Sequence, residues 1–309
     1  MKNKKKNNLI LKIIGSSSIL TIASIMVILI CILMIFDFFG AELTKEKISN
    51  NAEYADLYKQ ASNKYIKNGY VPLQRLLYFY LEDQSLTFDT LYQLNQNPTG
   101  KIEKEISVVC EDERVKNMGA CTASNIESNK EYLSVPTPLF NFPLKTSSYT
   151  ITSFYNEQRI IYGEQNVHSG WDLATSAQTP LYSVCNGTVH KVTYTQNENI
   201  PYDQSGNKTG NIIVLKCDQD YAETYYVTYA HLYPNSAKVK VGDSVSHWTE
   251  IASVGTTGHS TGNHLHYQVA DANWNLIDGM QLIDFNSVTD YSNQLEYKPP
   301  QEALPLPYK

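Results

Sequence analysis

The stretches TYYVTYAHL, residues 224–232, and GNHLHYQVA, residues 262–270, decide the fold of the C-terminal half of the chain. Both are rich in β-branched and aromatic residues, which favour strands. Similar short runs recur on either side of them, and glycines separate the runs. This pattern is typical of an all-β domain. The expected strands are 149–154, 181–184, 188–194, 212–217, 224–231, 251–254 and 265–269.

Histidines concentrate in three motifs of this domain: HSGWD at 168–172, YAHL at 229–232 and GNHLH at 262–266. Residues two apart on a strand project to the same face, so His264 and His266 point into one groove. Zinc binds to imidazole and carboxylate groups, and the motifs supply both.

The zinc ligands that these motifs predict are His168, Asp172 and His266. Three protein ligands leave a fourth position for water, whose pKa the cation lowers from about 15.7 toward ~7. We expect His231 and His264 to flank the ion, one as general acid or base and one as oxyanion stabiliser. Which imidazole takes which role is left open.

These motifs resemble the His-x-Gly-x-Asp and His-x-His motifs of the LytM/lysostaphin-type zinc metallopeptidases. The resemblance covers about residues 140–285 and implies the duplicated hybrid motif, an antiparallel sheet with an open groove. It also implies one Zn²⁺ per catalytic domain, held by His168, Asp172 and His266, with His231 and His264 as the catalytic pair. The implied substrate is the stem peptide or cross-bridge of peptidoglycan. Further matching blocks are TPLY at 179–182, GTV at 187–189, GN at 210–211, VGDSV at 241–245 and VGTTG at 254–258.

Four features depart from the family pattern. The usual Phe/Tyr-Gly-x-Arg before the first ligand appears as YNEQR at 155–159, and Asn263 replaces a common proline. The sequence SHWT at 246–249 replaces a Gly-Gln turn, and residues 196–209 form a polar insertion that we place at the groove rim. None of these changes removes a ligand, so they bear on specificity rather than on metal binding.

The N-terminus predicts a membrane anchor. A lysine-rich tail, residues 1–12, precedes an uncharged run at 13–36. At ~1.5 Å per residue this run crosses a hydrocarbon core of ~30 Å. The lysines favour a cytoplasmic N-terminus and an extracytoplasmic catalytic domain in a single-pass protein. A cleaved signal peptide is the alternative, but the run exceeds the usual apolar stretch of ~7–15 residues and no small-x-small cleavage site follows.

Residues 37–135 predict a small α-helical segment and a linker. An early helix is expected at 43–67, and Leu73, Leu76, Leu77, Tyr80 and Leu81 share one face of a helix that Pro72 begins. Residues 97–138 are polar and irregular in composition. Residues 41–96 either position the enzyme, dock a partner of an envelope complex, or form a stalk. The metallopeptidase domain is placed at 136–290 and a proline-rich tail at 291–309.

Four cysteines follow the anchor, in a compartment that permits disulfides. The favoured pairing joins Cys110 to Cys121 across a short loop and Cys185 to Cys217 across neighbouring strands. Free buried thiols at Cys185 and Cys217 are the alternative.

A net charge of -6 and a pI near 5.7 argue against nucleic acid as a partner. The predicted function is a zinc metalloendopeptidase that hydrolyses peptidoglycan on the outer face of the cytoplasmic membrane. It would serve cell-wall remodelling or local wall opening, which a conjugation or secretion apparatus also needs. The alternative is a catalytically silent scaffold that binds the wall or activates another hydrolase.

Overall fold

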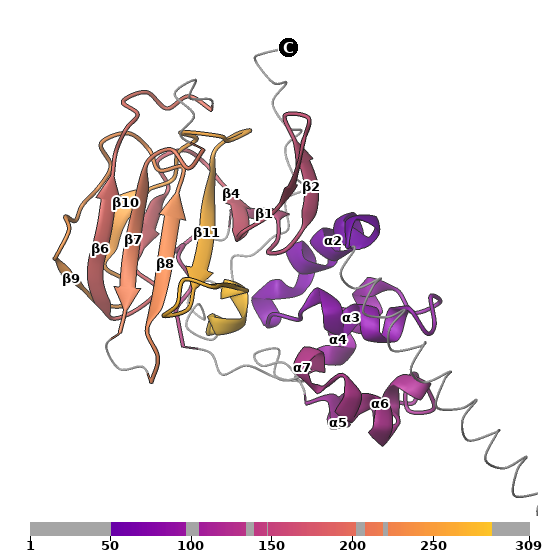
Figure 1. The fold of residues 1–309 in the computed structure, drawn as a ribbon. Coiled ribbons are helices and arrows are strands. Elements are labelled where there is room, and N and C mark those ends of the chain that lie inside the picture. The colour runs from indigo at the N-terminus through magenta and orange to yellow at the C-terminus, as the bar shows by residue number, and fades with distance from the viewer. Residues whose placement is uncertain are drawn as a thin grey trace, which may run out of the picture. The chain divides into compact units, whose positions relative to one another are not determined.

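The computed structural model describes residues 51–96, 105–133, 139–146, 148–201, 208–218 and 222–285 (Figure 1). All of them belong to one compact unit, residues 51–309. The predicted basic tail at 1–12, membrane span at 13–36 and proline-rich tail at 291–309 lie outside the described residues. Within the described ranges, no helix combines the length and hydropathy needed to cross a bilayer.

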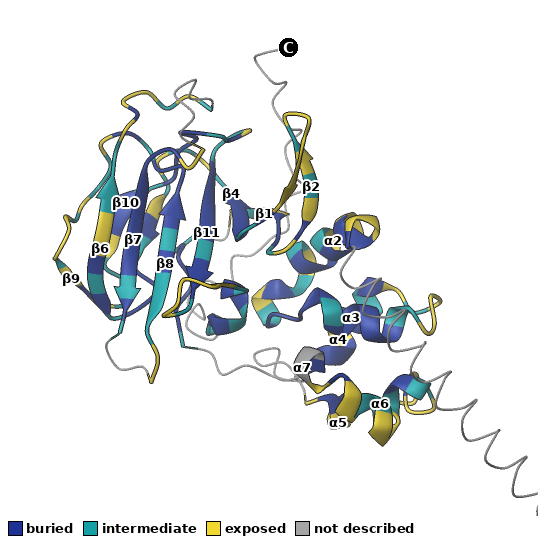
Figure 2. Cartoon of the chain, viewed as in Figure 1, coloured by how far each residue is buried: buried dark blue, intermediate teal, exposed yellow. Residues whose placement is uncertain are grey.

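An antiparallel sheet is the main feature of the C-terminal half, which confirms the predicted mainly β domain. Of its central strands, β11 (His264–Ala270) and β7 (Ile212–Cys217) are buried along most of their length, and β8 (Tyr225–Ala230) is buried at every residue but one from Val227 on (Figure 2). Short strand β12 (Leu276–Ile277) pairs with β11. The other strands follow the order β1 (Thr150–Ser153), β4 (Trp171–Ala174), β11 (His264–Ala270), β8 (Tyr225–Ala230), β7 (Ile212–Cys217), β6 (Gly187–Thr193) and β9 (Ser244–Val245).

The two faces of this sheet differ because side chains alternate along each strand. Leu215, Val227 and Tyr267 are fully buried on one face. A second layer, β5 (Pro180–Tyr182) paired with β10 (Glu250–Ser253), covers this side, and the Tyr229 hydroxyl donates to the Tyr182 carbonyl across the layers at 3.0 Å. The opposite face therefore carries His264 and His266 of β11.

The hairpin β2 (Gln158–Ile161) and β3 (Glu164–Val167) was not predicted, and neither were β4, β9 and β12. The two strands of the hairpin are largely exposed (Figure 2), so they lack the apolar alternation that marks a half-buried strand. Tyr162 and Gly163, the two residues of its turn, both have positive φ, as a type I′ turn requires.

Helices dominate the described residues before the sheet. The predicted face of α3 (Leu73–Tyr80) is buried through Leu73, Leu76 and Leu77, and Pro72 lies at the N-cap, one residue before the first turn. Of the early helix predicted at 43–67, residues 43–50 lie outside the described residues; the rest is helical except at Asn51, and it ends in a 3-10 turn that runs to Asn68. The other elements here are η1 (Ala52–Tyr54), α2 (Ala55–Tyr65), η2 (Ile66–Asn68) and α4 (Phe88–Asn95).

The region predicted as irregular, 97–138, contains short helices where the structure describes it, which corrects that expectation. They are α5 (Ile106–Val109), η3 (Gly119–Cys121), α6 (Ala123–Ser128) and α7 (Lys130–Leu133). Helices of four to six residues are too short to show a 3.6-residue period. A last short helix, η4 (Gly279–Leu282), follows β12.

Both predicted disulfides are confirmed. Cys110 pairs with Cys121, and Cys185 at the end of the β5 region pairs with Cys217 of β7. The first closes a short loop between small helices, and the second links the segment after β5 to the main sheet.

Candidate active site

The three predicted ligands come from two neighbouring strands and the turn before them. Asp172 of β4 and His266 of β11 are directly opposite each other in the antiparallel register. His168 precedes β4, and Gly170 lies between the first two ligands. A Cβ atom at Gly170 would lie only 2.4 Å from the Tyr267 carbonyl oxygen. Glycine is therefore required for the chain to come close enough to β11 for the ligands to meet.

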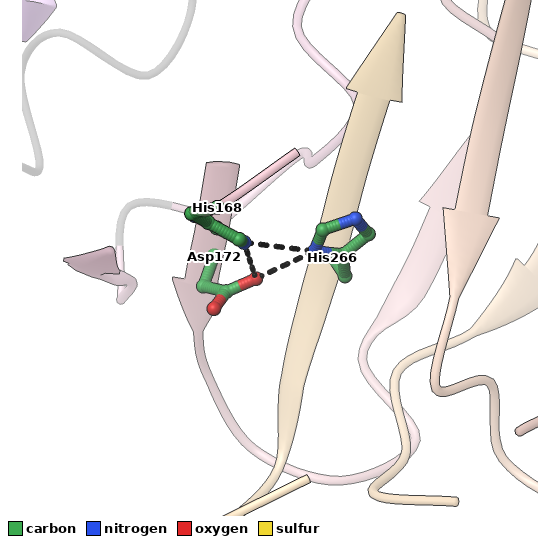
Figure 3. A group of neighbouring side chains, drawn as sticks. All are labelled: His168, Asp172 and His266. Carbon is green, nitrogen blue, oxygen red and sulfur yellow. Dashed lines mark hydrogen bonds and ion pairs between the residues drawn. The ribbon is translucent and has the colours of Figure 1, made fainter. Parts of the chain in front are cut away.

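The potential ligand atoms form a compact triangle (Figure 3). Nε2 of His168 lies 3.0 Å from Oδ1 of Asp172 and 3.0 Å from Nδ1 of His266, and the last two atoms are 2.9 Å apart. All three residues are buried. The possible ligand atoms of these three described residues all lie within 4.8 Å of one another, which is close enough to share a metal ion.

Hydrogen bonds on the far side of each imidazole show that the donor set suits a cation. Nδ1 of His168 lies 3.0 Å from the Phe154 carbonyl oxygen, which can only accept. His168 therefore carries its proton on Nδ1, and its Nε2 lone pair faces the triangle. Nε2 of His266 lies 3.3 Å from Oε1 of Gln268, which leaves the Nδ1 lone pair facing the same point.

The two carboxylate oxygens of Asp172 have different partners, the triangle and the guanidinium group of Arg159. Oδ1 faces the imidazoles, while Oδ2 accepts a hydrogen bond of 2.8 Å from Nη1 of Arg159. The same Nη1 also donates to the Ser153 hydroxyl at 2.6 Å. Arg159 thereby fixes the orientation of the carboxylate and leaves Oδ1 available to a metal.

His231 and His264 stand beside the triangle. Nε2 of His264 is 3.6 Å from Oδ1 of Asp172, and the rings of His231 and His264 are 4.7 Å apart between centroids. Each ring directs Nδ1 to a main-chain carbonyl, His231 to Thr257 at 2.7 Å and His264 to Gly262 at 2.8 Å. Both therefore carry the proton on Nδ1 and present a basic Nε2.

Burial and mutual charge set the protonation of this cluster. Burial opposes ionisation of Asp172, but the adjacent His168 and His264 outweigh it and hold its pKa well below the usual range. Burial is the main cause that lowers the pKa of His168. The pKa of His231 lies well below its ordinary value because of burial, with further lowering by His264 and His266. His168 and His231 are therefore neutral at pH 7, as a ligand and a proton acceptor must be.

Sequence reasoning missed several partners of these residues. Arg159 was noted only as a departure from the family pattern, and its contact with Asp172 was not foreseen. Gln268 lies two residues beyond His266 on the same strand face, so the period-2 rule could have found it. The three remaining histidines, His190, His247 and His259, lie outside the metal-binding triangle, and His259 stacks on Tyr162.

Two imidazoles and a carboxylate in ligand position, with two more basic imidazoles alongside, match a catalytic zinc centre with an open position rather than a four-ligand structural centre. The fold and the site thus define a metal-dependent hydrolase domain. Residues 166–278 match the model of peptidase family M23. This part of the chain, which carries all three residues of the triangle, is therefore similar to peptidase family M23.

Individual curated proteins are also similar to part of the chain. An "uncharacterized metalloprotease" of Haemophilus influenzae is 32% identical over 128 residues, and the peptidoglycan DD-endopeptidase ShyC of Vibrio cholerae is 29% identical over 120 residues. The matches cover 41% and 38% of this chain, and the chain spans only 24% of each relative.

Solved structures give a similar result. A zinc-containing peptidase from Vibrio cholerae is 32% identical, with a TM-score of 0.37, over 47% of this chain and 40% of that one. The catalytic domain of lysostaphin from Staphylococcus simulans is 26% identical, with a TM-score of 0.34, over 43% of this chain and 90% of that one.

Proposed function

We propose that the protein is a zinc endopeptidase that hydrolyses peptide bonds in the stem peptides or cross-bridges of peptidoglycan. The observation that carries this proposal is the buried triangle of His168, Asp172 and His266 within the M23 domain. The similarity to relatives described as peptidoglycan DD-endopeptidases supports the choice of substrate.

His168, Asp172 and His266 would hold the zinc ion through the three atoms that face one another. A bound zinc ion supplies a Lewis acid that polarises a peptide carbonyl and makes water acidic near neutral pH. Arg159 keeps Asp172 oriented through its 2.8 Å ion pair, and the carbonyls behind the imidazoles keep the correct tautomers. These residues thus maintain the charge and direction of the ligand set without taking part in proton transfer.

His231 and His264 are the proposed catalytic pair. Burial keeps His231 neutral, so its Nε2 accepts a proton from attacking water and returns it to the leaving amine. Nε2 of His264 lies on the Asp172 side of the cluster, and when this nitrogen gains a proton in addition to the one on Nδ1, it donates to the developing oxyanion. The 4.7 Å between ring centroids allows both to reach one scissile bond.

Incubation with purified peptidoglycan tests this function. The wild-type chain should release new amino termini, whereas His266→Ala, which removes a ligand, and His231→Ala, which removes the base, should not. Release by all three proteins would disprove the assigned chemistry. Binding of peptidoglycan without release by the wild type would instead favour the scaffold alternative. Mass spectrometry of the released fragments identifies the bond that is cut.

We further propose that residues 13–36 anchor the protein in the cytoplasmic membrane with the M23 domain outside. The uncharged run and the lysines before it support this proposal. Protease added to intact protoplasts should remove the M23 domain and spare an N-terminal epitope tag. Resistance of the domain to protease in intact protoplasts, with digestion after lysis, would contradict this topology. A role in opening the wall for a conjugation or secretion apparatus is compatible with this layout.

A further inference from the structure

The first zinc ligand is held by a turn that does not belong to the sheet. His168 is bonded to residues 154–157 at three points: its Nδ1 lies 3.0 Å from the Phe154 carbonyl, its N–H donates to the Glu157 carbonyl at 2.9 Å, and its carbonyl accepts from Asn156 N–H at 2.9 Å. The orientation of the His168 ring therefore follows the position of this turn.

The N-terminal helical residues hold that turn from the other side. The Asn51 amide donates to the Asn156 carbonyl at 2.7 Å and accepts from Gln158 N–H at 3.0 Å, so it brackets Glu157. Lys59 of α2 forms an ion pair of 3.3 Å with the buried Glu157 carboxylate. That carboxylate in turn accepts from Phe154 N–H at 3.0 Å.

A second anchoring point lies on β1, the strand that leads into the turn. The side chain of Asn63 accepts from Ile151 N–H at 2.6 Å and donates to the Ile151 carbonyl at 2.9 Å. It thereby takes the place of a neighbouring strand along the edge of β1. Tyr58, on the same helix, packs edge-on against Phe154, with ring centroids 4.8 Å apart. Tyr58 and Phe154 are both fully buried.

We propose that residues 51–68 are a positioning element of the zinc site, which holds the turn at 154–157 so that His168 faces Asp172 and His266. This inference rests on the proposed zinc peptidase function. It assigns a role in metal binding to residues that lie outside the M23 match, which begins at 166. Groups that orient metal ligands typically contribute about 10- to 100-fold to metal affinity.

The test measures zinc affinity of the full chain by competition with a chromophoric chelator. An Asn51→Ala/Asn63→Ala double variant should bind zinc about 10-fold more weakly or worse, since these amides orient the turn that orients a ligand. Co²⁺ in place of zinc should show an altered absorption spectrum, because its d–d bands report ligand geometry. The matched control is Asn125→Ala, which removes a 2.9 Å bond to the Gly119 carbonyl within the small helices. It should leave both readouts unchanged.

A milder pair of variants keeps the test decisive if the double variant does not fold. Lys59→Met removes the partner of Glu157 while keeping the aliphatic stem, and Lys59→Arg retains the charge. Lys59→Met should weaken zinc binding several-fold, and Lys59→Arg should restore it. Zinc affinity within twofold of wild type in Lys59→Met, with an unchanged Co²⁺ spectrum, would overturn the proposal. Failure of the wild type itself to bind zinc would instead overturn the proposed function.

Discussion

At the scale of single residues, the proposed mechanism assigns metal binding and proton transfer to different groups. His231 directs Nδ1 to Thr257 and is not one of the three residues of the ligand triangle. We therefore expect His231→Ala to lower kcat by about 10²- to 10⁴-fold with a full zinc content. His168→Ala should lose zinc as well as activity. Metal analysis beside the kinetics checks this, and loss of zinc from the His231 variant would show that the roles are misassigned.

Arg159 provides a second prediction. Arg159→Met leaves the Oδ2 of a buried carboxylate without its cationic partner, so the pKa of Asp172 should rise and zinc affinity should fall by about 10- to 100-fold. The loss should be larger at pH 5 than at pH 7, because protons compete with the metal for Asp172. Zinc titrations at the two pH values measure it, and equal losses would show that Arg159 acts only through packing.

The side chains of this site were predictable from the sequence, but their partners were not. The ligands lie in short motifs, and imidazole and carboxylate at that spacing have few other uses. The Phe154 and Thr257 groups that fix the tautomers are main-chain carbonyls, which any residue type provides. Arg159 lies in a departure from the family motif, so its contact became visible only in three dimensions.

At the scale of elements, the approach of the first motif to β11 makes Gly170 intolerant of substitution. Gly170→Ala places a Cβ atom against the Tyr267 carbonyl, so the turn must move away from β11. We expect zinc affinity to fall and unfolding free energy to drop by about 1–3 kcal/mol. Gly262→Ala is the control, because its Cβ would meet nothing within 4 Å. Thermal unfolding and metal content measure both, and equal behaviour of the two variants would contradict this account.

The strands that the sequence predicts correctly are those whose burial requires apolar, β-branched or aromatic residues. Strand β7 matches its expected range and β8 begins one residue later than expected, because both are half or fully buried and rich in β-branched or aromatic residues. The exposed hairpin β2–β3 has polar sequences that carry no such signal. Strand β4 was missed because its first two residues, Trp171 and Asp172, were interpreted as part of a ligand motif rather than as a strand.

At the scale of the whole molecule, the buried imidazoles couple stability to pH. The pKa values of His168 and His231 are lowered in the folded state, whereas an unfolded imidazole titrates near about 6.5. Below pH ~6.5 the unfolded chain therefore binds more protons, and the metal-free protein loses stability as the pH falls. Asp172, with its lowered pKa, adds a further loss only in the range below about pH 3.9.

Melting temperatures of the protein, measured with a chelator that removes metal, test this pH dependence. The decrease between pH 7.5 and pH 5.5 should be smaller in His231→Phe, which lacks one of the two groups. A metal-free wild type whose melting temperature rises on acidification would contradict the prediction.

The aromatic contact between Tyr58 and Trp171 has a consequence for how this protein can be divided. Trp171 also donates to Asp278 at 2.8 Å, and Tyr70 donates to the same carboxylate from the helical side. Excising the peptidase at the bounds of the family match, residues 166–278, would remove Tyr58 and Phe154 from the aromatic cluster around Trp171 and expose Trp171 to water. Such a fragment should aggregate during expression. Chimaeras that combine the peptidase region with a foreign N-terminal segment should likewise be insoluble.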